Sequence, residues 1–303
     1  MKVTRLDLDG TGSPLGLVGK ILKAEPDLKL PVQIEELAVA LDIGRIAELN
    51  ADGFIGGLLT DPERSFGGIL VKKGLHRHRR RFTIAHELGH FLIPFHKPAK
   101  AGQFLCSASD MARWSAREQD RAARMEVEAN EFAAGILLPA PSLRSFLQPY
   151  SDPDLRQMLA VHEHFDVSRE AASRAYAKFK GDKIATVLVK EGKIYRVYKA
   201  LGLPKLSVEK GEYVPASSVY SSFRGEPGSV SDLKRADAGQ WLQSEWGKRL
   251  PALYEQVLTQ SNGYSTIMLW CEEFELDEDY DPDADKTAND RFRQRQARFY
   301  DRR

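Results

Sequence analysis

The sequence predicts an α+β protein built from two globular domains and a charged tail. Its 303 residues correspond to about two domains of ordinary size. Helices and one hairpin are predicted up to residue 182, whereas strands dominate from residue 183 onward. A composition of 42% hydrophobic and 29% charged residues is typical of a globular chain that can bury a sizeable core.

Charge and hydropathy exclude several classes of protein. The 44 Lys and Arg nearly cancel the 43 Asp and Glu, so the chain is no polycation built to coat nucleic acid or an acidic membrane. No apolar run reaches the roughly 18 residues that span a bilayer, and the N-terminus MKVTRLDLDG lacks the apolar core of a signal peptide. We therefore expect a cytoplasmic protein without a membrane partner.

The two cysteines, Cys106 and Cys271, lie far apart and form no CxxC pair. Neither a disulfide framework nor a thiolate metal site is therefore expected, and both are interpreted as small core or surface residues.

The first predicted element is a short helix over residues 31–43 that opens the first domain and is stopped by Gly44. Two similar runs follow, FIGGLL from Phe54 and FGGIL from Phe66, and together they predict a hairpin. Their Gly-Gly pairs have two interpretations. A bulge or twist within the strands is favoured over a bare strand edge with which an extended peptide could pair.

Two long helices come next. The spacing predicts a half-buried helix over residues 79–95, with one apolar stripe formed by Ile84, Leu88, Phe91 and Phe95. A capping box at residues 115–118 predicts the start of the second long helix, which ends before Pro139. A helix, a short DVS turn and a second helix with Ser168 as its N-cap follow over residues 153–180.

The second half of the chain begins with two strands, IATVLV and KIYRVY, that flank a turn at Glu191-Gly192. A loop-like stretch (203–230) follows, and then a helix with Trp241 and Trp246, which is broken by Pro251. A further helix from Pro251, capped by Asn262-Gly263, and a final strand from Tyr264 complete this domain. The three tryptophans Trp241, Trp246 and Trp270 are expected in its core rather than in a ligand cage.

One motif carries chemistry, the H-E-x-x-H sequence His86-Glu87-Leu88-Gly89-His90 within the first long helix. Because four residues make about one helical turn, both imidazoles project from one face and can bind one metal ion, while Glu87 is offset toward a coordinated water. The alternative is a surface helix with two solvent-exposed histidines, since these residues lie opposite the apolar stripe. The metal site is favoured, because chance produces this motif in only roughly one such chain in a hundred.

A hydrolytic metal site needs a third protein ligand, and the second long helix offers three glutamates. Glu128 and Glu131 share a face with arginines, which is typical of a solvated, ion-paired surface. Glu126 lies on a face of small apolar residues, where a lone carboxylate needs a partner such as a metal ion. Asn130, one turn further on, is placed to hydrogen-bond a ligand imidazole and fix its tautomer.

The run R-R-F-T-I-A-H-E-L-G-H (80–90), followed by E-V-E-A-N-E-F-A-A-G-I-L-L-P (126–139), resembles the ImmA/IrrE-type metallopeptidases over about residues 30–182. The resemblance implies a thermolysin-like fold, with His86, His90 and Glu126 as zinc ligands and Glu87 as the catalytic base. Manganese stays open as an alternative metal. Members of this family typically cleave a helix-turn-helix repressor of the Xre type and so switch on phage, mobile-element or stress genes.

These observations define four segments. A metallopeptidase domain (1–150) precedes a helix-turn-helix-like segment (151–182), an α+β regulatory or sensor-like domain (183–275) and a charged tail expected to be disordered (276–303). One branch of the family ends in a sensor-like domain of the GAF type, and the third segment is similar to it in outline.

The predicted function is site-specific cleavage of an Xre-type repressor. The alternative is a non-catalytic regulator that binds DNA or a partner protein and uses the metallopeptidase fold as a scaffold. Two basic features could contact DNA, the run at residues 76–81 and the second helix of the helix-turn-helix-like segment. We favour a solvated helix entrance for the first and packing or substrate docking for the second, so direct DNA binding is not expected. The donor to the oxyanion is not assigned among Tyr150, His162 and His164.

Overall fold

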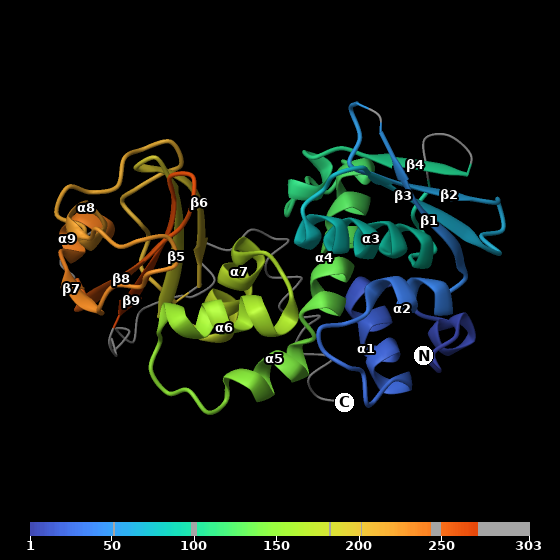
Figure 1. The fold of residues 1–303 in the computed structure, drawn as a ribbon, viewed down its shortest axis with the longest axis horizontal. Coiled ribbons are helices and arrows are strands. Elements are labelled where there is room, and N and C mark those ends of the chain that lie inside the picture. Colours follow the sequence, from blue (N-terminus) through green and yellow to red (C-terminus); the bar gives the residue numbers. More distant parts are fainter. Residues whose placement is uncertain (51, 98–101, 182, 201, 244–249, 272–303) are drawn as a thin grey trace. The chain divides into compact units, whose positions relative to one another are not determined.

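The computed structural model describes all residues except 51, 98–101, 182, 201, 244–249 and 272–303. The chain forms two compact units, shown in Figure 1, and its α+β composition is confirmed. The first unit comprises Met1–Ser151 and Gln157–Ala172, and the second comprises Asp152–Arg156 and Ser173–Arg303. No helix among the described residues is both long and apolar enough to cross a membrane.

The first unit contains a four-stranded sheet of order β1-β3-β2-β4. Its strands are β1 (Ile43–Leu49), β2 (Gly56–Thr60), β3 (Gly67–Lys72) and β4 (Gln103–Cys106). Strand β1 is parallel to β3, whereas β2 is antiparallel to both β3 and β4, which confirms the predicted hairpin. Because both Gly-Gly pairs lie in inner strands, the idea that a peptide pairs with their edge is wrong.

Two helical elements precede the helix that was expected to open the domain, so that part of the prediction is wrong. They are the 3-10 helix η1 (Arg5–Leu8) and helix α1 (Pro14–Ala24), where Ser13 accepts a hydrogen bond from the Gly16 backbone N. The expected helix is present as α2 (Ile34–Ala40). It ends before Gly44, which lies in the unpredicted strand β1.

The centre of the first unit is helix α3 (Arg77–Leu92), which packs against β2, β3 and helix α4 (Arg121–Leu137). Every residue from Thr83 to Phe91 is buried, so the alternative of solvent-exposed histidines is wrong. The reason is that α4 covers the face opposite the apolar stripe, whereas Phe95 at the end of the stripe is 70% exposed. The helix keeps exposure only in its first turns, residues 77–82, and at Leu92.

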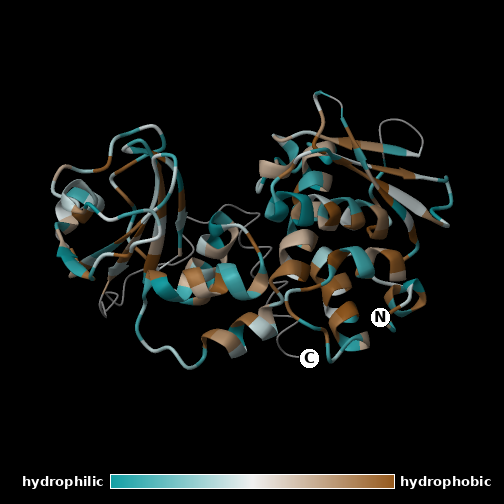
Figure 2. Ribbon diagram, viewed as in Figure 1, coloured by the Kyte–Doolittle hydropathy of each residue, from teal (hydrophilic) through white to brown (hydrophobic). Residues whose placement is uncertain are grey.

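Helix α4 starts later than the sequence predicted. Its N-cap is Asp120, whose side chain accepts from the Ala123 backbone N, so the capping box at residues 115–118 is wrong. Helices α1 and α4 both carry hydrophobic residues in Figure 2. They meet closely at Gly135, where an added Cβ would lie 3.2 Å from Val18 Cγ2 and 3.5 Å from Leu15 Cδ2. This contact anchors α4 from the side away from the sheet.

Helices α5 (Ala140–Leu147), α6 (Leu155–Phe165) and α7 (Arg169–Phe179) follow. Ser168 accepts from the Ala171 backbone N, which confirms the predicted cap of α7. The DVS turn also anchors the basic run: Asp166, a largely buried residue, forms ion pairs with Arg77 and Arg81 of α3. Arg81 is therefore held inside the unit by Asp166 and departs from the expected solvated helix entrance, whereas the Arg77 side chain is 71% exposed, in line with that expectation.

The second unit contains a five-stranded antiparallel sheet of order β6-β5-β9-β8-β7. Its strands are β5 (Ile184–Lys190), β6 (Lys193–Lys199), β7 (Lys234–Ala236), β8 (Leu253–Thr259) and β9 (Tyr264–Cys271). The turn at Glu191-Gly192, with both φ angles positive, confirms the β5–β6 hairpin. The predicted helix from Pro251 is wrong, because β8 occupies that segment and Asn262-Gly263 forms the turn into β9.

Two short helices, α8 (Val219–Ser222) and α9 (Ala238–Trp241), complete the second unit. Trp241 is fully buried in its hydrophobic core, as expected, and its Nε1 donates to Glu255 Oε2 at 3.2 Å. Glu255 also accepts from the Ser218 hydroxyl and the Tyr220 backbone N, and burial raises the pKa of its carboxyl. Trp246 and the predicted disordered tail lie outside the described residues.

Candidate metal centre

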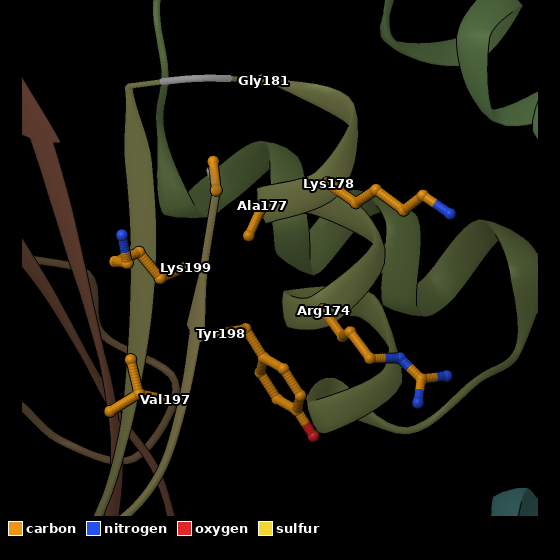
Figure 3. Close-up of a pocket in the computed structure, with 8 residues that line it drawn as sticks. Arg174, Ala177, Lys178, Gly181, Val197, Tyr198 and Lys199 are labelled. Carbon is orange, nitrogen blue, oxygen red and sulfur yellow. The ribbon is translucent and has the colours of Figure 1, made fainter. Parts of the chain in front are cut away.

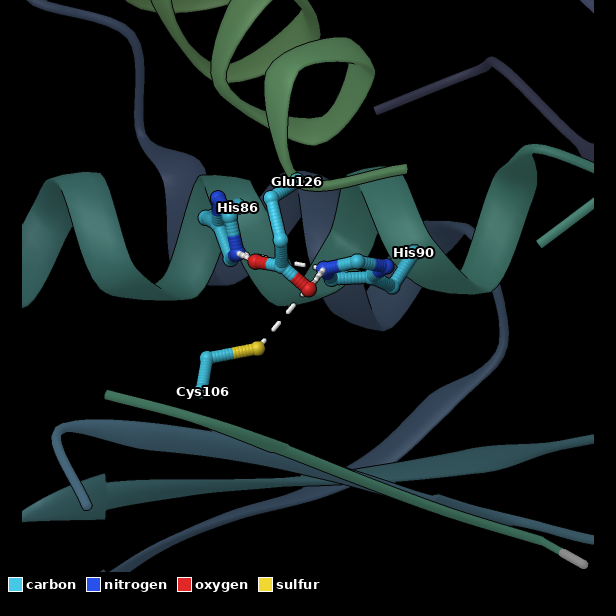
Figure 4. Close-up of side chains that lie close together, drawn as sticks. All are labelled: His86, His90, Cys106 and Glu126. Carbon is cyan, nitrogen blue, oxygen red and sulfur yellow. Dashed lines mark hydrogen bonds and ion pairs between the residues drawn. The ribbon is translucent and has the colours of Figure 1, made fainter. Parts of the chain in front are cut away.

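Four side chains from three elements meet inside the first unit, as Figure 4 shows. Helix α3 supplies His86 and His90, α4 supplies Glu126, and β4 supplies Cys106. Glu126 lies between the two imidazoles: its Oε2 is 3.2 Å from His86 Nε2, and its Oε1 is 3.5 Å from His90 Nε2. The four possible ligand atoms lie within 4.8 Å of one another, so the group could hold a metal ion.

Small residues allow the two helices to approach at this point. A Cβ atom on Gly89 would lie 3.1 Å from Phe132 Cδ1 and 3.3 Å from the backbone Cα of Ala129. A larger residue at position 89 would push α4 away and carry Glu126 with it. The close approach expected from Gly89 and the alanines is therefore present.

Asn130 determines the tautomer of His86. Its Nδ2 donates to the backbone carbonyls of Asp110, at 3.2 Å, and Arg113, at 2.7 Å. Its Oδ1 therefore faces His86 Nδ1, 2.9 Å away, and can only accept a hydrogen bond there. The proton of His86 resides on Nδ1, which leaves the Nε2 lone pair directed into the cluster.

His96 and Glu128 fix His90 in the same way, and the sequence interpretation missed both. His96 Nε2 donates to Glu128 Oε2 at 2.9 Å, so its Nδ1 accepts from His90 Nδ1, also at 2.9 Å. Burial lowers the pKa of His90 to about 3, and it also lowers the pKa of His96. Both rings are therefore neutral near pH 7, and His90 Nε2 presents a lone pair to the cluster.

Arg64 holds the chain reversal that brings His96 back to His90. Its Nη1 donates to the carbonyl of His90 at 3.1 Å and to that of Ile93 at 2.8 Å, and its Nη2 contacts the carbonyl of His96. The guanidinium thus satisfies carbonyls that the end of α3 leaves without helical partners. No spacing rule along the chain connects Arg64 or His96 to the motif.

The cluster consists of hydrogen-bond acceptors that face one another. His86 Nε2 and His90 Nε2 are only 3.1 Å apart, and Glu126 Oε2 is buried without a hydrogen-bond donor among the described residues. Lone pairs at these distances repel unless a cation lies between them. A tetrahedral metal ion with bonds of about 2.0 Å separates its ligand atoms by about 3.3 Å, which matches this spacing. The residues therefore fit a divalent cation, and the assignment of individual ligands stays a prediction.

Glu87 lies beside the cluster and is fully buried. Its carboxylate has no nitrogen or oxygen hydrogen-bond donor in the described part of the chain and approaches the Cys106 thiol, and burial raises its pKa to about 7. Strand β2 makes room for it, since a Cβ on Gly56 would lie 2.5 Å from Glu87 Oε1. The close packing of α3 on the sheet is a reason for this glycine that the sequence interpretation missed.

The other candidates have separate environments. Tyr150 is 42% exposed, His162 Nδ1 contacts the carbonyl of Val167, and the ring of His164 stacks on Phe146. A hollow of about 450 Å³ lies in the second unit between α7 and β6, and Figure 3 shows the residues that line it, Arg174 and Tyr198 among them. None of its lining residues belongs to the metal cluster.

Residues 45–176 match the family model described as the IrrE N-terminal-like domain, a peptidase family. The matched segment is similar to the IrrE N-terminal-like domain. The predicted resemblance to the ImmA/IrrE family is thereby confirmed, and the segment has a metallopeptidase-like fold. All four residues of the cluster lie within the matched segment, whereas the sheet of the second unit lies beyond it.

The search of curated proteins gives no match. Among solved structures, the chain is similar to a Mycobacterium tuberculosis transcriptional regulator, with a TM-score of 0.43 and 14% sequence identity. The similarity covers 88% of this chain and 74% of that chain.

Proposed function

We propose that the protein is a zinc-dependent endopeptidase that cleaves a helix-turn-helix repressor of the Xre type and thereby derepresses stress, phage or mobile-element genes. The observation that carries the proposal is the convergence of three acceptors, on His86, His90 and Glu126, beside the buried carboxylate of Glu87. The family match supports it, because these residues lie inside the matched segment. One Zn²⁺ is the proposed cofactor, with manganese as the alternative metal.

The residues have distinct tasks in this proposal. His86, His90 and Glu126 would hold the metal, which when bound supplies a Lewis acid that polarises the scissile carbonyl and acidifies water. Glu87 takes the proton from the attacking water and passes it to the leaving amine. A pKa of about 7 suits a carboxyl that must both accept and release a proton near neutral pH. Asn130 and His96 hold the imidazoles in the tautomer that leaves Nε2 free.

Strand β4 offers a way to bind an extended substrate. It is an edge strand of the described sheet, and it lies directly at the cluster because Cys106 is its last residue. An extended peptide can add to such an edge through backbone hydrogen bonds. Pairing would bring a substrate carbonyl next to Glu87.

Co-expression with a helix-turn-helix repressor of the Xre type tests the proposal. Wild type should cleave this repressor, as followed by immunoblot, and Glu87→Gln should abolish cleavage while retaining stoichiometric zinc. Glu36→Gln, an exposed glutamate on α2, is the matched control and should cleave normally. Cleavage by Glu87→Gln, or cleavage in the presence of a chelator, would refute the mechanism. If Glu87→Gln relieves repression although it does not cleave the repressor, a non-catalytic regulator is favoured.

A further inference from the structure

The fourth member of the cluster, Cys106, has no task in the hydrolysis described above. We propose that Cys106 is a fourth ligand of the metal centre, and that its thiolate holds the peptidase in a closed, latent state. The ligation stands on the geometry of the cluster, whereas the latency rests on the proposed peptidase function.

The position of Cys106 is fixed by the sheet rather than by a loose side chain. In the β2–β4 ladder Cys106 lies opposite Gly56, the residue beneath Glu87, and its carbonyl accepts from the Ile55 backbone N at 2.9 Å. Cys106 is 1% exposed, and its Sγ lies 3.6 Å from His90 Nε2. Metal bonds of about 2.3 Å to sulfur and 2.0 Å to nitrogen at a tetrahedral angle give a separation of about 3.5 Å.

The surroundings of the thiol are those of a ligand rather than of a core cysteine. Core cysteines pack against apolar atoms, whereas this sulfur faces the imidazole of His90 and the carboxylates of Glu87 and Glu126. Glu87 approaches the thiol, and Glu126 Oε2 is buried without a hydrogen-bond donor among the residues described, so the sulfur lies in a group of acceptors that a cation can join. Metal ligation would replace the S–H bond by a sulfur–metal bond and release one proton to solvent.

Four protein ligands would close the centre. Catalytic zinc sites keep three protein ligands and one open position, whereas sites with four protein ligands are structural. A centre of His86, His90, Glu126 and Cys106 therefore has no position for the water that Glu87 would deprotonate. Strand β4 has four residues and, among the described strands, pairs only with β2, so it can withdraw Cys106 at a lower cost than an inner strand could.

Cobalt(II) loading of the full chain tests the ligation directly, because a cobalt–thiolate bond produces a charge-transfer band in the near ultraviolet. The chain has only two cysteines. In Cys271→Ser, which alters the core of the second unit, any such band must come from Cys106. We expect the band in wild type and in Cys271→Ser, and its loss in Cys106→Ser at equal cobalt content. Absence of the band from cobalt-loaded wild type, or its persistence in Cys106→Ser, would overturn the ligation.

Zinc affinity provides a second measurement. Chelator competition should show weaker zinc binding in Cys106→Ser and Cys106→Ala, by about tenfold or more, with Cys271→Ser unchanged. Circular dichroism verifies that each variant is folded. The cobalt band of Cys271→Ser keeps the test decisive even if both substitutions at Cys106 prevent folding.

Repressor cleavage tests the latency separately. Cys106→Ala should cleave the co-expressed repressor at least about tenfold faster than wild type, because the fourth position is then open to water. Equal rates would overturn the latency while leaving the ligation intact. A cobalt band without cleavage by wild type or either Cys106 variant would instead refute the proposed peptidase function.

Discussion

Replacing Gly56 with alanine should destabilise the first unit and displace Glu87, although it adds only one methyl group. The new Cβ would lie 2.5 Å from both Glu87 Oε1 and Thr83 Cγ2, and 2.9 Å from Met111 Cε. Ordinary contacts require about 3.5–4.0 Å, so helix or strand must move by about 1 Å. Overpacking of this kind costs about 1–3 kcal/mol. At about 2–4 °C per kcal/mol for a unit of this size, the melting temperature should fall by about 2–12 °C.

Gly68→Ala is the matched control for this experiment. Gly68 lies on the neighbouring strand β3, and its Cβ would meet nothing closer than the Arg45 carbonyl at 3.8 Å. Calorimetry should therefore show it unchanged or slightly stabilised, because alanine restricts the unfolded chain. Gly56→Ala should keep its zinc, since the proposed ligands are untouched, but should lose cleavage. If the free energies of unfolding of Gly56→Ala and Gly68→Ala differ by less than about 0.5 kcal/mol, the argument that β2 is packed closely against Glu87 is refuted.

Three further changes test other parts of the molecule. Asn130→Ala removes the acceptor of the His86 Nδ1–H hydrogen bond and should weaken zinc binding by about 10–100-fold in chelator competition. An unchanged zinc affinity would mean that Asn130 does not hold the ring. Asp166→Asn leaves the largely buried Arg81 without its carboxylate and should lower the free energy of unfolding, measured with urea, by about 1–3 kcal/mol. A decrease below about 0.5 kcal/mol would contradict the anchoring role of the turn. Because burial raises the pKa of Glu255 above 4.5, its contribution to stability is complete below that pH and is lost as the pH rises through the folded-state pKa. The unfolding free energy of wild type minus that of Glu255→Gln should therefore shrink as the pH rises above 4.5, and a constant difference would contradict the raised pKa.

The parts of the site that could be predicted from the sequence are those set by spacing along one helix. His86 and His90 share a face because they are one turn apart, and Glu126 and Asn130 share a face of α4 for the same reason. The expectation that small residues bring these helices together also depends only on local sequence. These inferences use the helical period, and the choice of Glu126 adds the cost of burying a carboxylate.

The parts that could not be predicted depend on pairing between distant segments. Cys106 reaches the cluster through its register with Gly56, and His96 returns to His90 through a reversal held by Arg64. The segment after Pro251 has a similar explanation. Its apolar residues suit either a helix or a strand, and pairing with β9 on one side and β7 on the other decides in favour of the strand.

A bound metal ion would account for the burial of the polar groups of His86, His90 and Glu126 but not for that of the Glu87 carboxylate. A cation would satisfy the inward lone pairs of His86, His90 and Glu126, so binding it would relieve their mutual repulsion and stabilise the fold. Glu87 gains no such relief, because it is the residue offset from the ligand face, and its carboxylate still has no nitrogen or oxygen donor among the described residues. A buried carboxyl without such a donor costs stability that a purely structural metal site would not require. Under the proposed function, the arrangement of Glu87 is what distinguishes a centre for proton transfer from one that only holds the helices together.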